Sequence, residues 1–172
     1  MRFINIVLVV LTIEVIVVSF LVLINADSIA LGTQAKLMKK YINDEYIITK
    51  KVAYNINKIC VSEYRNIDRQ FCYWILASDW VNRNIVYKND TFIEEILYLN
   101  DDPEKTYIHG NDCDGIAIMF VSILKELGFK DVYLAFESDG TNDHVCVLWN
   151  DKNIIRKFNC INAKIYYIER VL

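Results

Sequence analysis

Cys113, His144 and Asn159 are the residues of this sequence whose types and spacing best fit nucleophilic catalysis. Cys113 follows Asp112, a typical helix N-cap, and precedes a long apolar stretch, so we expect it in the first turn of a helix. Free backbone N–H groups and the helix dipole at that position stabilise a thiolate and can bind a developing oxyanion. Asp112 and Asp114 raise the pKa of a thiol between them, so a nearby imidazolium is needed to favour the thiolate. The alternative interpretation of Cys113 is a small residue buried in the core.

A predicted β-hairpin supplies the base and the group that orients it. Two β-like runs, residues 144–149 and 154–159, flank four polar residues. With the middle two of those four at the tip of the turn, Asn159 lies directly opposite His144, and such pairs have Cβ atoms about 4.5–5.5 Å apart. The side-chain oxygen of Asn159 then accepts one imidazole N–H and leaves the other ring nitrogen for Cys113. This is a Cys–His–Asn arrangement, and an ordinary cross-strand polar pair is the alternative.

His109 is the competing base, because the chain has only two histidines. It is expected on the loop before the Cys113 helix, beside Gly110, with no residue to orient it. A metal site built from His109, Asp112, Cys113 and His144 has no recognised ligand spacing. The sequence from Asp112 to Gly115 matches a calcium loop only in part, and no glutamate closes it. We therefore expect neither a metal nor a cofactor.

The elements that position these residues follow one another as helices and then strands. Two helical stretches are expected between Gln34 and Tyr64 with a break at Asn43-Asp44, and a further helix follows Asp68. A short helix is expected around Phe92–Leu99, and Asp101-Asp102-Pro103 is expected to end the segment that contains it.

The helix from Cys113 to Leu127 is apolar along two neighbouring stripes, which is typical of a buried central helix, and Gly128 is its expected stop. Beyond it the chain changes to short β-like runs, Val132–Phe136, His144–Trp149, Ile154–Asn159 and Lys164–Ile168. The pattern predicts an α+β fold in which a central helix packs on an antiparallel sheet.

The first residues predict a membrane anchor. Phe3–Ile24 is almost entirely apolar and would rise roughly 33 Å as a helix, enough to cross a hydrocarbon core of about 30 Å. This run is longer than that of a signal peptide, so an uncleaved single-pass transmembrane helix is favoured over cleavage after Ala26. Glu14, in mid-span, faces a partner helix or is protonated. Flanking charges do not fix the orientation, and an extracytoplasmic domain is the working expectation. The expected parts are an anchor, a helical lead-in and a catalytic domain, at residues 1–26, 27–67 and 68–172.

Composition and cysteine content exclude several classes of protein. The net charge of -3 over 172 residues gives no electrostatic signature of a nucleic-acid binder. Five cysteines without a CxxC pair indicate neither a disulfide scaffold nor a zinc ribbon. In an exported domain, five cysteines allow two disulfides and one free thiol.

The segment from Trp80 to Gly128 resembles the transglutaminase-like cysteine-protease superfamily. In such proteins the cysteine opens the central helix, a histidine opens a β-strand and an aspartate follows, and His144 and Asn159 have the spacing of that pair. Asn159 replaces the usual aspartate, and Cys146 stands where an aromatic residue commonly follows the histidine. The matching pieces are Trp80–Tyr87, Pro103, Gly110–Ala117 and Leu124–Gly128.

The resemblance implies a papain-like core and an amide-bond hydrolase that acts on a peptide or protein substrate through a thioester acyl-enzyme. Cys113 would attack the carbonyl, His144 would take and return the proton, and Asn159 would orient His144. Water is the default acceptor, and an amine acceptor would make the same site a transferase. The two departures leave a catalytically inactive, membrane-tethered binding or scaffold domain as the alternative.

Overall fold

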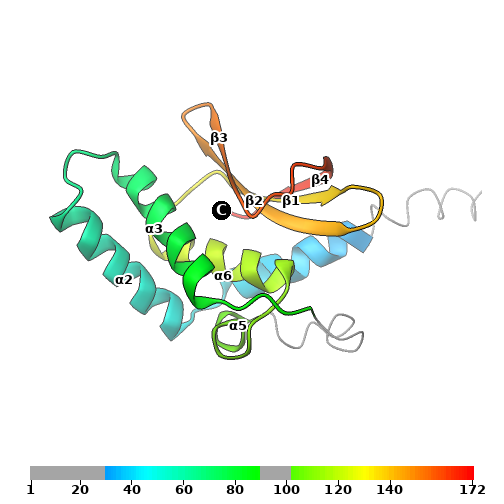
Figure 1. Ribbon diagram of the computed structural model, residues 1–172, viewed down its shortest axis with the longest axis horizontal. Coiled ribbons are helices and arrows are strands. Elements are labelled where there is room, and N and C mark those ends of the chain that lie inside the picture. The colour runs from blue at the N-terminus through cyan, green and yellow to red at the C-terminus, as the bar shows by residue number, and fades with distance from the viewer. Residues whose placement is uncertain (1–29, 90–101) are drawn as a thin grey trace, which may run out of the picture. The chain divides into compact units, whose positions relative to one another are not determined.

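The helices and strands of this chain form an α+β structure. The computed structural model describes residues 30–89 and 102–172. In Figure 1, α2, α3 and α6 lie on one side of a single sheet. A helix over residues 30–43 comes first. The elements that follow are α2 (Ile47–Ser62), α3 (Arg69–Asn84), α5 (Pro103–His109), α6 (Cys113–Glu126), β1 (Val132–Ser138), β2 (Asp143–Asp151), β3 (Ile154–Phe158) and β4 (Lys164–Arg170).

Two predictions fall on residues that are not described. The anchor at residues 3–24 and the short helix around Phe92–Leu99 both lie outside the described ranges. Among the helices that are described, none combines the length and the apolar character needed to cross a membrane.

Helix α6 is the central element, as its two apolar stripes predict. Every residue from Asp114 to Leu124 is buried. The side chain of Asp112 accepts a hydrogen bond from the backbone N–H of Asp114, so Asp112 is the N-cap. After the last turn the chain passes through Gly128 at φ 79°, a conformation that glycine adopts without steric cost. The helix from Cys113 onward and its two boundaries are thus confirmed.

The four antiparallel strands form a sheet in the order β3-β2-β1-β4. Its helix-facing side packs aromatic rings against the helices. The ring of Phe158 stacks on Phe120 of α6 with centroids 3.9 Å apart, and Trp149 stacks on Trp74 of α3 at 5.5 Å. Because β3 and β4 are the two outer strands, the chain between them, residues 159–163, must cross β2 and β1. We call this segment the crossover.

The hairpin register predicted for β2 and β3 is wrong. Trp149 pairs with Arg156 and Val147 pairs with Phe158, so the turn consists of Lys152 and Asn153 alone. Both turn residues have positive φ, 51° and 74°, which is the geometry of a tight type I′ hairpin turn. The strand register is therefore displaced, and Asn159 does not pair with His144.

Pro103 begins the helix that places His109, while the segment it was expected to end lies outside the described residues. The side chain of Asp102 accepts the backbone N–H of Lys105, and Pro103 occupies the first turn of α5. A proline is tolerated there because its missing N–H would have no intrahelical partner. His109 consequently lies at the end of α5 and not on a loop.

The cysteines form two disulfides. Cys60–Cys72 joins α2 to α3, and Cys146–Cys160 joins β2 to the crossover. All five cysteines lie in the described residues, and Cys113 is free. The chain therefore has the two bridges and one thiol that its cysteine count permits.

Candidate active site

Cys113 opens α6, and the segment before it is held by the chain that follows α3. Tyr87 and Asn111 form an isolated parallel bridge. The N–H of Lys88 donates to the carbonyl of Asn111, and the N–H of Asn111 donates to the carbonyl of Val86. The motif after Trp80 and the motif around Cys113 are thus neighbours in space, although residues 90–101 separate them along the chain.

Gly115 lets the side chain of Asn111 lie against the first turn of α6. A Cβ added at Gly115 would be 2.1 Å from the Cγ of Asn111. Asn111 is 1% exposed, donates to the hydroxyl of Thr106 and accepts the backbone N–H of Asp112. The glycine after Asp112-Cys113-Asp114 is therefore a packing requirement of the helix start.

The Cys113 thiol is held in its protonated form. Burial raises its pKa most, and the carboxylates of Asp114 and Asp112 raise it further. The sulfur lies 3.5 Å from the Oδ1 of Asp114, which accepts the thiol proton. The backbone N–H of Val145 acts in the other direction, since it donates to the sulfur and lowers the pKa. The first turn of α6 thus meets β2 at the residue next to His144.

His144 is oriented by the main chain of Asn159. Its Nε2 lies 2.5 Å from the backbone oxygen of Asn159. A carbonyl can only accept, so we assign the proton to Nε2 and the lone pair to Nδ1. Asn159 is exposed and has a φ of 57° at the end of β3. The orienting group is therefore the carbonyl of Asn159 and not the side-chain oxygen that the sequence suggested.

The faces of β2 separate His144 from the helix. Successive side chains of a strand alternate, so His144 shares a face with Cys146, while Val145 and Val147 lie on the other. Val147 pairs with Phe158, whose ring stacks on α6, so the His144 side chain starts from the face away from α6. The imidazole nevertheless reaches the rim at the end of the strand, where it lines the same cleft as Cys113.

This cleft has a volume of about 650 Å³, within the range of small-molecule and peptide side-chain sites. Asp112, Asp139 and Asp143 line it together with Cys113 and His144, and no lysine or arginine is among its described lining residues. Asp139 is ionised, because hydrogen bonds from the hydroxyl of Thr141 and from the N–H groups of its turn lower its pKa to about 2. The cleft is thus an acidic environment.

His109 is exposed at the end of α5 and is not among the described residues that line the cleft. Two groups in the described part of the chain bring possible metal ligands within 4.8 Å of one another. One group is Asp112, Cys113 and Asp114, and the other is Glu137, Cys146 and Cys160. Neither group contains a histidine, and both sulfurs of the second group belong to a disulfide.

Sequence reasoning missed Glu137 and the backbone groups. Glu137 is 0% exposed on β1, just beyond the predicted end of that strand, and the signal available was a single acidic residue after an apolar run. The N–H of Val145 and the carbonyl of Asn159 have no signature in residue type, since every residue other than proline has both groups.

Comparison of the chain with protein-family models, with curated proteins and with solved structures found no match.

Proposed function

We propose that the chain is a transglutaminase-like cysteine hydrolase that cleaves an amide bond through a thioester. The observation that supports this most is the shared cleft, which is lined both by a thiol at the start of the central helix and by a histidine whose tautomer is fixed. The succession of helices, central helix and antiparallel sheet is in keeping with the fold expected from the resemblance.

In the proposed reaction, the Cys113 sulfur attacks the substrate carbonyl carbon while the thiol proton passes to Nδ1 of His144. The C–N bond then breaks, and the imidazolium returns the proton to the leaving amine. Water attacks the thioester with His144 again as base, which releases the carboxylic acid and restores the thiol. Backbone N–H groups of the first α6 turn stabilise the oxyanion. An amine in place of water would give transamidation.

The charge of the cleft suggests which substrates it accepts. Three aspartates without a lysine or arginine among the described lining residues favour a peptide that is neutral or positively charged around the scissile bond. An acidic peptide would place like charges together.

Two disulfides support a location in an oxidising compartment, because such bonds persist outside the cytosol. We therefore propose a domain outside the cytoplasm, held at the membrane through residues 3–24.

A catalytically inactive binding domain is the second candidate. It is favoured by the protonated state of Cys113, which burial and two aspartates impose, and by the position of His144 on the far face of β2. The two candidates differ in whether the thiol forms a covalent intermediate.

The deciding experiment incubates the full-length protein with a library of short peptides and follows both products and acyl-enzyme by mass spectrometry. The proposal expects cleavage and a thioester on Cys113, both lost in Cys113→Ala. Cleavage should fall by about 100-fold or more in His144→Ala, the size of a general-base contribution. His109→Ala is the matched control and should behave as the parent. A protein that folds, binds peptides and never acylates Cys113 is the inactive domain.

A further inference from the structure

The crossover is fastened to the sheet at three places, and all three lie near His144. The carbonyl of Asn159 accepts the Nε2–H of His144. One residue later, Cys160 is bonded to Cys146, which is two residues beyond His144 on β2. Further along, the N–H groups of Ile161 and Ala163 donate to Oε2 of Glu137 at 3.0 and 3.2 Å.

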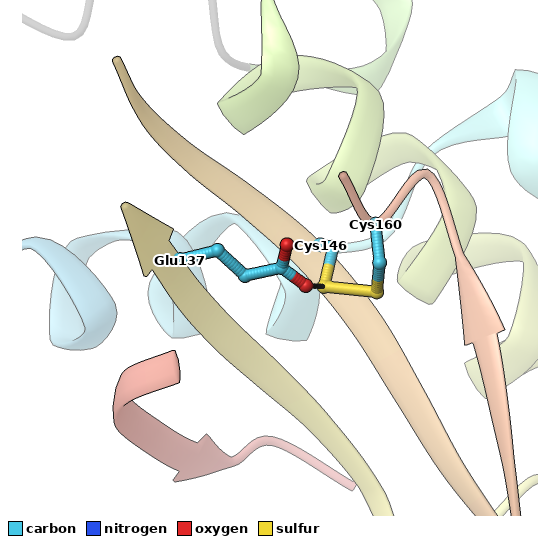
Figure 2. Close-up of side chains that lie close together, drawn as sticks. All are labelled: Glu137, Cys146 and Cys160. Carbon is cyan, nitrogen blue, oxygen red and sulfur yellow. Dashed lines mark hydrogen bonds between the residues drawn. A yellow bond between two sulfur atoms is a disulfide. The ribbon is translucent and has the colours of Figure 1, made fainter. Parts of the chain in front are cut away.

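Glu137 is the part of this arrangement that nothing in the proposed reaction requires. It pairs with His144 across β1 and β2 and is 0% exposed. A buried carboxyl group is costly unless it is hydrogen-bonded, and here the crossover supplies the donors. Figure 2 shows the carboxyl group pointing at the Cys146–Cys160 bridge.

The other oxygen of Glu137, Oε1, lies 3.0 Å from the Cys146 sulfur, the contact drawn as a dashed line in Figure 2. A sulfur in a disulfide carries no proton, so this contact becomes a hydrogen bond only when the bridge is reduced. The Cys146 thiol would then have an acceptor already in place. Both redox states of the bridge can therefore be accommodated in this buried position.

We propose that Glu137 and the Cys146–Cys160 disulfide are positioning groups for His144, and that reduction of the disulfide releases the imidazole from its fixed tautomer. The inference rests on the proposed function, since it concerns the base of that reaction. With the bridge intact, Cys160, the residue after Asn159, is covalently bonded to β2, the strand that contains His144, and this holds the Asn159 carbonyl in place. Glu137 holds the other side of the same short segment, at Ile161 and Ala163, so the Asn159 carbonyl is fixed only while both the bridge and the Glu137 hydrogen bonds are present.

The redox step is a simple exchange. A dithiol reductant gives two electrons and two protons to the S–S bond, leaving thiols at Cys146 and Cys160, and is itself oxidised to a cyclic disulfide. Oxidation reverses the step. Cys113 has no part in it.

The Cys60–Cys72 disulfide provides a matched control. It spans 12 residues in sequence, against 14 for Cys146–Cys160, so the two bridges restrict the unfolded chain to a similar extent. It joins α2 to α3 and includes no residue of the crossover. If the His144 tautomer changes because the fold is less stable, the change should follow loss of either bridge. If it changes because the imidazole is no longer positioned, the change should follow loss of Cys146–Cys160 alone.

The experiment measures the tautomer of His144 by long-range ¹H–¹⁵N correlation NMR on the full-length protein, with His109→Gln to assign the signals. The Cys60→Ser/Cys72→Ser variant retains only the second bridge, so it is recorded before and after dithiothreitol, with reduction verified by mass. We expect the Nε2–H tautomer before reduction. Afterwards its excess over the Nδ1–H tautomer should fall roughly two- to tenfold, the bias of one ordinary hydrogen bond.

The Cys146→Ser/Cys160→Ser variant should match the reduced state without any reductant. Glu137→Leu should shift the tautomer in the same direction, and Glu137→Gln, which keeps an acceptor oxygen, should restore it. An unchanged tautomer after verified reduction would overturn the proposal, as would equal changes on loss of either bridge.

Failure of the proposed function is distinguishable from failure of this inference. If the tautomer responds to reduction but no peptide is ever cleaved, the positioning arrangement stands and the hydrolase is wrong. If peptides are cleaved at the same rate whether or not the bridge is reduced, and the tautomer does not change, the positioning arrangement is wrong and the hydrolase stands.

Discussion

Asp114 raises the pKa of Cys113, and replacing it with asparagine tests the electrostatics of the site directly. Its Oδ1 lies 3.5 Å from the Cys113 sulfur and accepts the thiol proton. After burial, it is the strongest of the groups that raise the pKa of Cys113. Asp114→Asn removes the charge and preserves the size of the side chain, and the N-cap made by Asp112 remains.

The magnitude follows from Coulomb's law. At an effective dielectric constant of about 20, unit charges about 4 Å apart repel by about 4 kcal/mol, equivalent to a pKa difference of about three. Water in the open cleft screens part of this, so we expect the pKa of Cys113 to fall by about one to two. The thiolate fraction at neutral pH then rises about 10- to 100-fold. Its intrinsic nucleophilicity falls with pKa, so alkylation should accelerate about 3- to 16-fold.

The assay is the rate of alkylation by iodoacetamide at pH 7, measured on the full-length protein without reductant so that Cys113 is the only free thiol. Asp139→Asn is the control, because it removes a charge from the same cleft that is not among the main causes of the raised pKa of Cys113. Its rate should equal that of the parent. An Asp114→Asn rate equal to or below that of the parent would refute the electrostatic reasoning.

Three further predictions concern the residues around the site. Asn159→Gly should retain peptide cleavage within about threefold of the parent, because glycine suits a φ of 57° and the carbonyl is kept. Asn159→Val should lose about tenfold or more of the cleavage rate through backbone strain. Equal losses in the two variants would show that the Asn159 side chain, and not its carbonyl, orients His144. Gly115→Ala should lower the free energy of unfolding in guanidinium chloride by about 1–3 kcal/mol, since its Cβ would meet Asn111, and an unchanged midpoint would contradict this packing. Asp139 has a pKa of about 2 in the folded chain against an ordinary value of 3.8, so its carboxylate stabilises the fold fully above that ordinary value and loses the effect as the pH falls through about 2. The difference in urea midpoint between the parent and Asp139→Asn should shrink steadily as the pH falls from about 4 to about 2. A difference that is undiminished at pH 2 would show that the charge is not its cause.

The central helix could be predicted from sequence because its signals are local. Asp112 caps it, two apolar stripes run along it and Gly128 follows it, and each is visible in the residues themselves. The strands after it were also predicted in number and order, since their apolar runs are separated by polar turns. Such signals depend on residue types over a few positions, which is why they survive in the folded chain.

The hairpin register could not be obtained in the same way. It depends on whether Lys152 adopts a positive φ, a conformation that a lysine seldom takes and that its type does not announce. The tight turn is stabilised by a diagonal contact between the two strands, in which Asp151 accepts two hydrogen bonds from the Arg156 guanidinium. The local sequence permits a turn centred on Asp151-Lys152 or one centred on Lys152-Asn153, and tertiary contacts decide which of the two forms.

The pairing of His144 with Asn159 was predicted for the wrong reason. The two residues are in contact, but through the main-chain oxygen of Asn159. The incorrect register, which paired their side chains, did not predict this contact. The burial of Glu137 likewise depends on the crossover, which exists only because β4 lies beside β1. Long-range topology decides both, and no window of sequence contains it.

The burial of α6 has a consequence for how the protein would lose activity on warming. Amide hydrogens in an element buried at eleven successive positions should exchange with solvent only when the whole domain unfolds. The crossover exposes Asn159, Ile161 and Asn162, so those of its amides that are not bonded to the buried Glu137 should exchange through local openings. The proposed nucleophile therefore lies at the end of the buried helix, whereas the proposed base depends on a segment at the surface. For the proposed hydrolase, inactivation should begin below the melting temperature, as a reversible local opening around His144 while Cys113 stays in place.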